Sequence, residues 1–213
     1  MKDKELIATL AADLKPVSPA APVGVTLLLW LLVSSLYVVS LTLLFGPFRP
    51  GAFYALVYVP RYGFELLLGV GAFVAFARVA LAEAVPGIDV RWWRRIAWVL
   101  LAGWLLQFLL AFNWPMLEPT MLGKRLHCAW ESYLYSVPPL LYLVRLQRQR
   151  YPLQPQRAVF HAALAAGLLP ALIMQLACMY EPSHVLLFHV LPVAGLGAVA
   201  TFVSWLYFRR KGR

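Results

Sequence analysis

Long apolar blocks separated by short polar segments run through most of this chain. Six blocks of about twenty residues stand out, and a helix of that length crosses the ~30 Å hydrocarbon layer of a bilayer. The fourth block is the least apolar, because it holds Glu131 and the pair Pro138 and Pro139. The pattern predicts an all-α integral membrane protein with six transmembrane helices, at roughly 24–46, 63–85, 95–113, 127–145, 157–179 and 185–208.

The first 23 residues differ from the rest in their pattern. In residues 1–15, the side chains of Leu6, Leu10 and Leu14 recur at helical spacing and predict one amphipathic face. A cleavable signal peptide is not expected, because no apolar region precedes the first block. The predicted organisation is a short cytoplasmic segment (1–15), a proline-rich linker (16–23), a six-helix transmembrane domain (24–208) and a basic cytoplasmic tail (209–213).

The composition agrees with a membrane protein, since 62% of the residues are hydrophobic and 13% are charged. Soluble domains are nearer to half apolar and a quarter charged. The net charge of +10 follows membrane topology rather than nucleic-acid binding, and no direct nucleic-acid contact is expected. With a cytoplasmic N-terminus, 14 basic residues lie inside, four lie outside, and Arg78 lies within the second helix. This positive-inside bias predicts that both termini are cytoplasmic (N-in/C-in). The inside set is Lys2, Lys4, Lys15, Arg91, Arg94, Arg95, Arg145, Arg148, Arg150, Arg157, Arg209, Arg210, Lys211 and Arg213, and the outside set is Arg49, Arg61, Lys124 and Arg125.

The two cysteines of the chain, Cys128 and Cys178, lie at the ends of the fourth and fifth blocks. The predicted topology places both at the outer face at similar depth. Three interpretations stay open: a structural disulfide in an oxidising compartment, a thiolate metal site, or two unrelated buried thiols. The spacing does not separate them, because the two residues come from different helices.

Further metal-ligating side chains occur near the same two block ends. His127, Glu131 and His184 are the candidate additional ligands, and His189 lies nearby. Imidazole and thiolate groups suit soft or borderline metal ions, although histidines near a membrane interface also serve as ordinary polar residues. No constitutive cofactor is expected, and a soft or borderline metal ion at the cysteine site is the candidate ligand.

Three stretches resemble the NrsF-type membrane anti-sigma factors, the family named for negative regulation of sigma F. They are LIATLAADLKPV near the N-terminus, HCAWESYLYSVPPLLYLVR in the fourth block, and ACMYEPSHVLLFHVLP across the fifth and sixth blocks. The resemblance implies a bacterial inner-membrane protein that holds an extracytoplasmic-function sigma factor and releases it under stress. It places Cys128 and Cys178 in a sensor of toxic metals or oxidants, and it implies no role for the nearby histidines or Glu131. The residues that it places in the sigma-binding segment are Leu6, Leu10, Asp13, Leu14, Pro16 and Val17.

Two other classes of function compete with a regulator. A membrane thiol oxidoreductase would use the cysteines, but the chain has no CxxC pair, P-loop or HExxH motif, so an enzyme is not expected. A small metal transporter would need polar groups in mid-membrane, where Gln107 and Gln175 are the main candidates. The resemblance favours the regulator, and the physics is compatible with it, because a segment of fifteen residues is marginal as a free helix and can fold in a partner's groove. The sequence does not indicate the oligomeric state.

Overall fold

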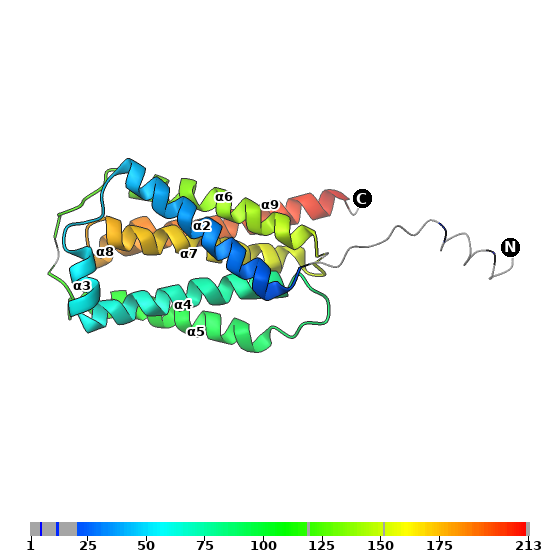
Figure 1. Ribbon diagram of the computed structural model, residues 1–213, viewed down its shortest axis with the longest axis horizontal. Helices are drawn as coiled ribbons and strands as arrows, with labels where there is room; N and C mark the ends of the chain where they lie inside the picture. The colour runs from blue at the N-terminus through cyan, green and yellow to red at the C-terminus, as the bar shows by residue number, and fades with distance from the viewer. Residues whose placement is uncertain (1–4, 6–11, 13–20, 119, 151, 212–213) are drawn as a thin grey trace.

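The computed structural model describes residues 5, 12, 21–118, 120–150 and 152–211, and the regular elements in this part of the chain are helical (Figure 1). This confirms the all-α prediction. The residues of the predicted sigma-binding segment, Leu6, Leu10, Asp13, Leu14, Pro16 and Val17, lie outside the described residues. The elements are α2 (Val23–Phe45), α3 (Ala52–Tyr58), α4 (Pro60–Ala82), α5 (Arg91–Ala111), α6 (Cys128–Arg148), α7 (Pro155–Ala177), α8 (Pro182–Val185), the π-helical turn η1 (Leu186–Val190) and α9 (Leu191–Lys211).

The long helices lie side by side and run in alternating directions along the bundle (Figure 1). At one end, called the cysteine end, α6 begins with Cys128 and α7 is followed by Cys178. At the other end, called the basic end, α5 begins with Arg91 and α6 ends with Arg148. The start of α2 and the end of α9 both lie at the basic end (Figure 1).

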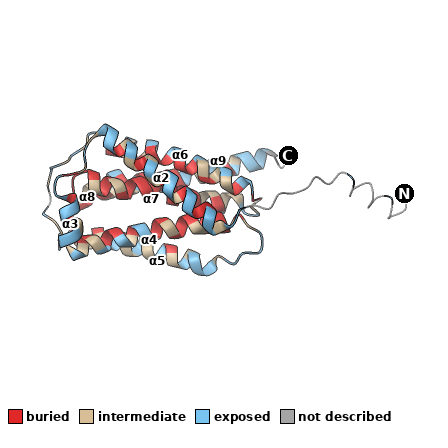
Figure 2. Cartoon of the chain, viewed as in Figure 1, coloured by how far each residue is buried: buried red, intermediate tan, exposed pale blue. Residues whose placement is uncertain are grey.

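The helix α7 forms the centre of the bundle, and it is buried along most of its length (Figure 2). It packs against α4, α6 and α9. Small side chains make this close approach possible: a Cβ atom at Gly167 would lie 2.9 Å from Val193 Cγ1 and 3.2 Å from Val193 Cα. In a membrane, such small-residue contacts replace the hydrophobic force that drives packing in water.

The outer helices expose apolar side chains, as expected for surfaces that face lipid. Leu32 and Leu36 on α2 and Val99 on α5 are each at least 60% exposed. Five helical segments are long and apolar enough to cross a membrane, namely Val23–Phe45, Pro60–Ala82, Arg91–Ala111, Pro155–Ala177 and Pro182–Arg210. The helix α6 has the needed length but is less apolar, because tyrosines, serines, prolines and Glu131 interrupt its sequence. Five of the six predicted spans are therefore long and apolar enough to cross a membrane. The remaining one, the fourth predicted span at α6, stays a prediction.

Two local features were not expected from the sequence. A short helix, α3, lies between α2 and α4, and Pro60 at the first position of α4 separates the two helices. Proline suits that position, because its missing N–H would have no partner there. The second feature is the π-helical turn η1, which interrupts the last span between α8 and α9.

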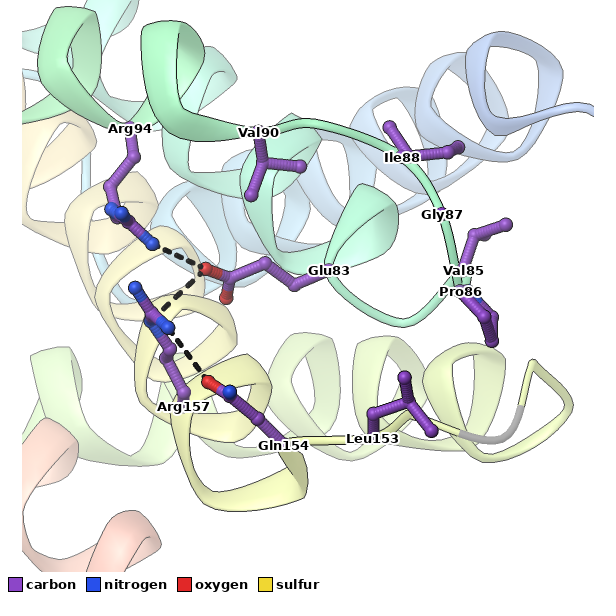
Figure 3. Close-up of a pocket in the computed structure, with 10 residues that line it drawn as sticks. All are labelled: Glu83, Val85, Pro86, Gly87, Ile88, Val90, Arg94, Leu153, Gln154 and Arg157. Atoms are coloured by element: carbon purple, nitrogen blue, oxygen red, sulfur yellow. Dashed lines mark hydrogen bonds and ion pairs between the residues drawn. The ribbon is translucent and has the colours of Figure 1, made fainter.

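Buried polar groups fasten the helices at the basic end. The carboxylate of Glu83, directly after α4, lies 3.4 Å from Arg94 Nη1 on α5 and 3.4 Å from Arg157 Nε on α7 (Figure 3). His161 Nδ1 lies 2.7 Å from the other oxygen of Glu83. Nearby, the amide of Gln147 on α6 donates to the carbonyl groups of Ala80 and Ala158 on α4 and α7, each at 2.9 Å. These contacts hold α4, α5, α6 and α7 together.

The contact of α7 with α9 gives a test of the packing. Gly167→Ala should lower the stability by about 1–3 kcal/mol, because the new methyl group meets the backbone of Val193 and the stiff side chain of a β-branched residue. The melting temperature of the purified protein in detergent measures the effect. Gly24→Ala is the matched control, since a Cβ atom there meets nothing within 4 Å. Equal melting temperatures for both variants would contradict this account of the packing.

Candidate functional site

The two cysteines meet at the cysteine end of the bundle although 50 residues separate them in the sequence. Cys128 is the first residue of α6, and Cys178 follows the last residue of α7 in an extended conformation. Their sulfur atoms lie 2.9 Å apart, both side chains are buried, and both thiols are free. The site is thus held by two helices that pack directly against each other.

Two histidines complete this cluster. His184 in α8 places Nε2 at 3.3 Å from the sulfur of Cys178. His189 lies in η1, and its ring is 5.2 Å from that of His184 between centroids. One donor atom from each of Cys128, Cys178, His184 and His189 can be chosen so that all four lie within 4.8 Å of one another. We call these four residues the thiol–imidazole cluster.

His189 is the least exposed member together with Cys178, since both have an exposed fraction of 0%. Neither ring nitrogen of His189 makes a hydrogen bond of regular geometry within the described part of the chain, and the thiol of Cys178 is the polar group that interacts with the ring. A buried polar group that is only weakly satisfied is costly, so it calls for a functional explanation.

The local sequence explains how two histidines five residues apart reach the same cluster. In a regular α-helix, a separation of five residues leaves the side chains about 140° apart around the axis. The wider turn of η1 takes in one extra residue, and His189 then faces the same side as His184. π-turns of this kind are frequent at functional sites.

Glu181 fixes the start of this segment. Its carboxylate caps α8 by accepting hydrogen bonds from the backbone N–H groups of Ser183 at 3.2 Å and His184 at 2.7 Å. Partial burial raises the pKa of Glu181, but the hydrogen bonds from Ser183 and from these backbone groups outweigh burial, and the net pKa is lowered. The charged carboxylate therefore serves as a helix cap and positions His184 beside Cys178.

The other two predicted ligands take different positions. Glu131 lies one turn into α6 and forms an ion pair with Arg125 at 3.1 Å. His127 precedes α6, is exposed, and stands outside the group of four converging donors. His189 joins the cluster instead, and helical periodicity could not have indicated it, because only the π-turn brings it into line.

Arg125 closes the cluster on the side of α2. One nitrogen of its guanidinium donates to the carbonyl groups of Thr42, Gly46 and Pro47 at 3.1, 2.7 and 3.1 Å. The backbone carbonyl of Arg125 accepts the thiol of Cys128 at 3.3 Å. Beside it, a pocket of about 490 Å³ is lined by residues that include Arg125, Cys128 and His184, so the cluster is approached from the side of Cys128, while Cys178 lies completely buried behind it.

A second polar network lies directly behind the cluster. Glu65 on α4 is fully buried and accepts hydrogen bonds from Gln175 on α7 and from the hydroxyl of Tyr180, the latter at 3.1 Å. The hydroxyl of Tyr62 donates to the backbone carbonyl of Gln175 at 3.0 Å, and the guanidinium of Arg49 lies 5.9 and 5.8 Å from the rings of Tyr62 and Tyr180. Because Tyr180 is two residues after Cys178, this network fixes the backbone that carries the second thiol.

Comparison with known proteins adds one finding to this geometry. The chain matches no curated protein and no solved structure. The model of the family NrsF, described as negative regulator of sigma F, matches residues 10–209, which include the helical bundle and the whole thiol–imidazole cluster. The match confirms the resemblance seen in the sequence and covers far more than half of the chain, so this chain belongs to the NrsF family of negative regulators of sigma F.

Proposed function

We propose that this chain is an anti-sigma factor of the bacterial inner membrane that sequesters an extracytoplasmic-function sigma factor and releases it under metal or oxidative stress. Family membership supports a sigma factor as the partner. The observation that carries the sensing role is the approach of the two thiols to 2.9 Å at one end of a bundle whose basic residues gather at the opposite end. A stimulus outside the membrane and a partner inside it require such a separation.

The proposed topology has six spans with both termini in the cytoplasm. The helix α6 serves as the fourth span in chain order and completes the set of six, because its 21 residues run alongside the other long helices (Figure 1). The basic end then faces the cytoplasm, as the positive-inside bias requires. At the cysteine end, three of the four basic residues of the predicted outer set are engaged by the protein itself: Arg49 lies over aromatic rings, Arg61 donates to the carbonyl group of Trp114, and Arg125 binds carbonyl groups.

The proposed output is the N-terminal segment. Leu6, Leu10 and Leu14 form the apolar stripe of a helix that folds in a groove of the sigma factor, and Asp13, Pro16 and Val17 belong to the same binding segment. Binding by a short segment suits regulation, because the ordering of a free peptide weakens the complex and makes it easy to reverse.

The proposed input is a change in the distance between the start of α6 and the end of α7. A metal ion or a disulfide bond at Cys128 and Cys178 favours one separation of these helix ends over others. The two helices are joined at the basic end by a short connection. A change in the distance between their ends at the cysteine site is therefore transmitted along α6 and α7 to the cytoplasmic side. To switch the population almost fully, the ligand must favour the releasing arrangement by a factor of about 10⁴.

Thiol chemistry also supports an alternative, a membrane thiol oxidoreductase, since two free thiols 2.9 Å apart are placed to exchange with a disulfide. A small metal transporter has less support: the buried polar groups of the described bundle, such as Glu65, Gln175, Glu83 and His161, gather toward its two ends. The experiments below separate a regulator from both alternatives, because neither alternative needs the N-terminal segment to bind a protein.

The topology can be checked with reporter fusions. A fusion at the C-terminus, and another in the connection between α4 and α5, should both report a cytoplasmic position, because the basic end carries the positive-inside signal. A fusion in the connection between α5 and α6 should report the outer side. A C-terminus outside the membrane would show an odd number of spans and would exclude α6 as a span.

Removal of the N-terminal stripe should abolish repression. Deleting residues 1–15, or changing Leu6, Leu10 and Leu14 to Asp, should release the sigma factor, because each leucine contributes roughly 1.5–3 kcal/mol of burial. Transcription from a sigma-dependent promoter in cells measures the release, and membrane fractionation confirms insertion. The control carries Asp at Ala8 and Ala12, on the opposite face of the predicted helix, and should keep repression. Full repression in the leucine variant would remove this segment as the binding site.

Loss of either thiol should uncouple the signal from the output. Cys128→Ser and Cys178→Ser should keep the promoter repressed when cells are exposed to Cd²⁺ or to a thiol oxidant, whereas the natural chain should release it. Ala129→Ser is the matched control, since it adds a hydroxyl beside the site without removing a thiol. The idea fails if the cysteine variants respond like the natural chain.

A further inference from the structure

His189 is completely buried, and its imidazole makes no hydrogen bond of regular geometry within the described residues; its polar neighbour is the thiol of Cys178. The backbone around His189 is π-helical rather than α-helical, and the ring lies beside that of His184, at 5.2 Å between centroids. A buried imidazole whose polar neighbours are thiols has the chemistry of a ligand rather than that of a packing residue.

The geometry of the cluster matches a tetrahedral ion. Zinc bonds of about 2.3 Å to sulfur and 2.0–2.1 Å to nitrogen place neighbouring ligand atoms about 3.4–3.8 Å apart. The four donors already lie within 4.8 Å of one another, and the two sulfurs, at 2.9 Å, need only to part slightly. The pocket of about 490 Å³ beside Cys128 and His184 offers an entry path.

The charges of the cluster also fit a divalent ion. Two thiolates and two neutral imidazoles around a dication give a neutral site, which suits a buried position. The carboxylate of Glu131 is already paired with Arg125, and that of Glu181 caps α8, so neither adds negative charge to the cluster.

We propose that Cys128, Cys178, His184 and His189 together form one S₂N₂ binding site for a d¹⁰ metal ion of the Zn²⁺ and Cd²⁺ class. The proposal rests on the sensing role given above and names its ligand and its full donor set. Binding breaks two S–H bonds, forms two metal–sulfur and two metal–nitrogen bonds, and releases two protons to solvent without any change of oxidation state. A disulfide would use the thiols alone and would not explain why His184 and His189 converge on them.

Such an ion would join three parts of the bundle. Cys128 comes from the start of α6, Cys178 from the end of α7, and the two histidines from α8 and η1, which lead into α9. The ion therefore connects α6, α7 and α9 at the cysteine end.

The test uses the purified full chain in detergent with its thiols reduced. Titration with Co²⁺ should give the visible absorption of a tetrahedral ion together with thiolate-to-cobalt charge transfer, and Zn²⁺ should displace it with release of about two protons per ion. His189→Ala and His184→Ala should each weaken Zn²⁺ binding at least ~10-fold. Even the loss of a residue that only hydrogen-bonds to a metal ligand weakens metal affinity by that factor. Each cysteine-to-serine variant should lose part of the charge-transfer band.

His127→Ala is the matched control, because His127 is exposed beside Cys128 and lies outside the cluster. It should bind Co²⁺ and Zn²⁺ like the natural chain. Equal Zn²⁺ affinity in His184→Ala and the natural chain would overturn the donor set, as would a purified protein whose thiols resist reduction because they form a stable disulfide. His184 is only half-buried, so its variant decides the question if His189→Ala fails to fold.

The outcome is separable from the proposed function. If cobalt binding is absent while Cd²⁺ still releases the promoter through the cysteines, the sensing role stands and the S₂N₂ set is wrong. If cobalt binds as described while the cysteine variants still respond to Cd²⁺ in cells, the site stands and the sensing role is wrong.

Discussion

The close packing of α7 against its neighbours is the constraint on which the rest of this structure depends. Lipid offers no hydrophobic force between helices, so contact depends on shape, and α7 supplies a surface of alanines and glycine for that purpose. Val193 of α9 approaches Gly167 so closely that a single methyl group would not fit. Because α7 is held on several sides, the position of Cys178 at its end is fixed as well.

Buried carboxylates link α4 to the α7 segment at both ends of the bundle, whereas the described residues show no such link for α6 and α9 at the cysteine end. Glu65 ties α4 to Gln175 and Tyr180 at the cysteine end, and Glu83 ties the other end of α4 to His161 and Arg157. The pair of α4 and α7 is thus fastened at both ends. At the cysteine end α6 and α9 have no such carboxylate link to this pair in the described residues, and the thiol–imidazole cluster stands between them and α7.

The sequence predicted the helices better than it predicted the site. The blocks at 24–46 and 63–85 became Val23–Phe45 and Pro60–Ala82, and the second begins early because Pro60 starts the helix in a polar stretch that an apolar pattern misses. The pairing of Cys128 with Cys178 follows from topology that the blocks already imply. His189 could not be found this way, since its place in the cluster depends on a local departure from the period of 3.6 residues on which pattern reading rests. The weak apolar character of α6 has a similar origin, because tyrosines and serines that are buried within the bundle look polar in the sequence.

The π-turn has a mechanical consequence for the helix that follows it. In η1 the backbone hydrogen bonds span five residues instead of the four of a regular α-helix, so this turn contains one extra residue between α8 and α9. If that surplus were released, the hydrogen-bond pattern would shift by one residue, and α9 would rotate by about 100° or slide by about 1.5 Å relative to α8. A helix transmits such a twist along its whole length, and α9 runs to Lys211 at the basic end. The orientation of His189 and the face that α9 presents at the basic end are therefore coupled to each other through a single turn.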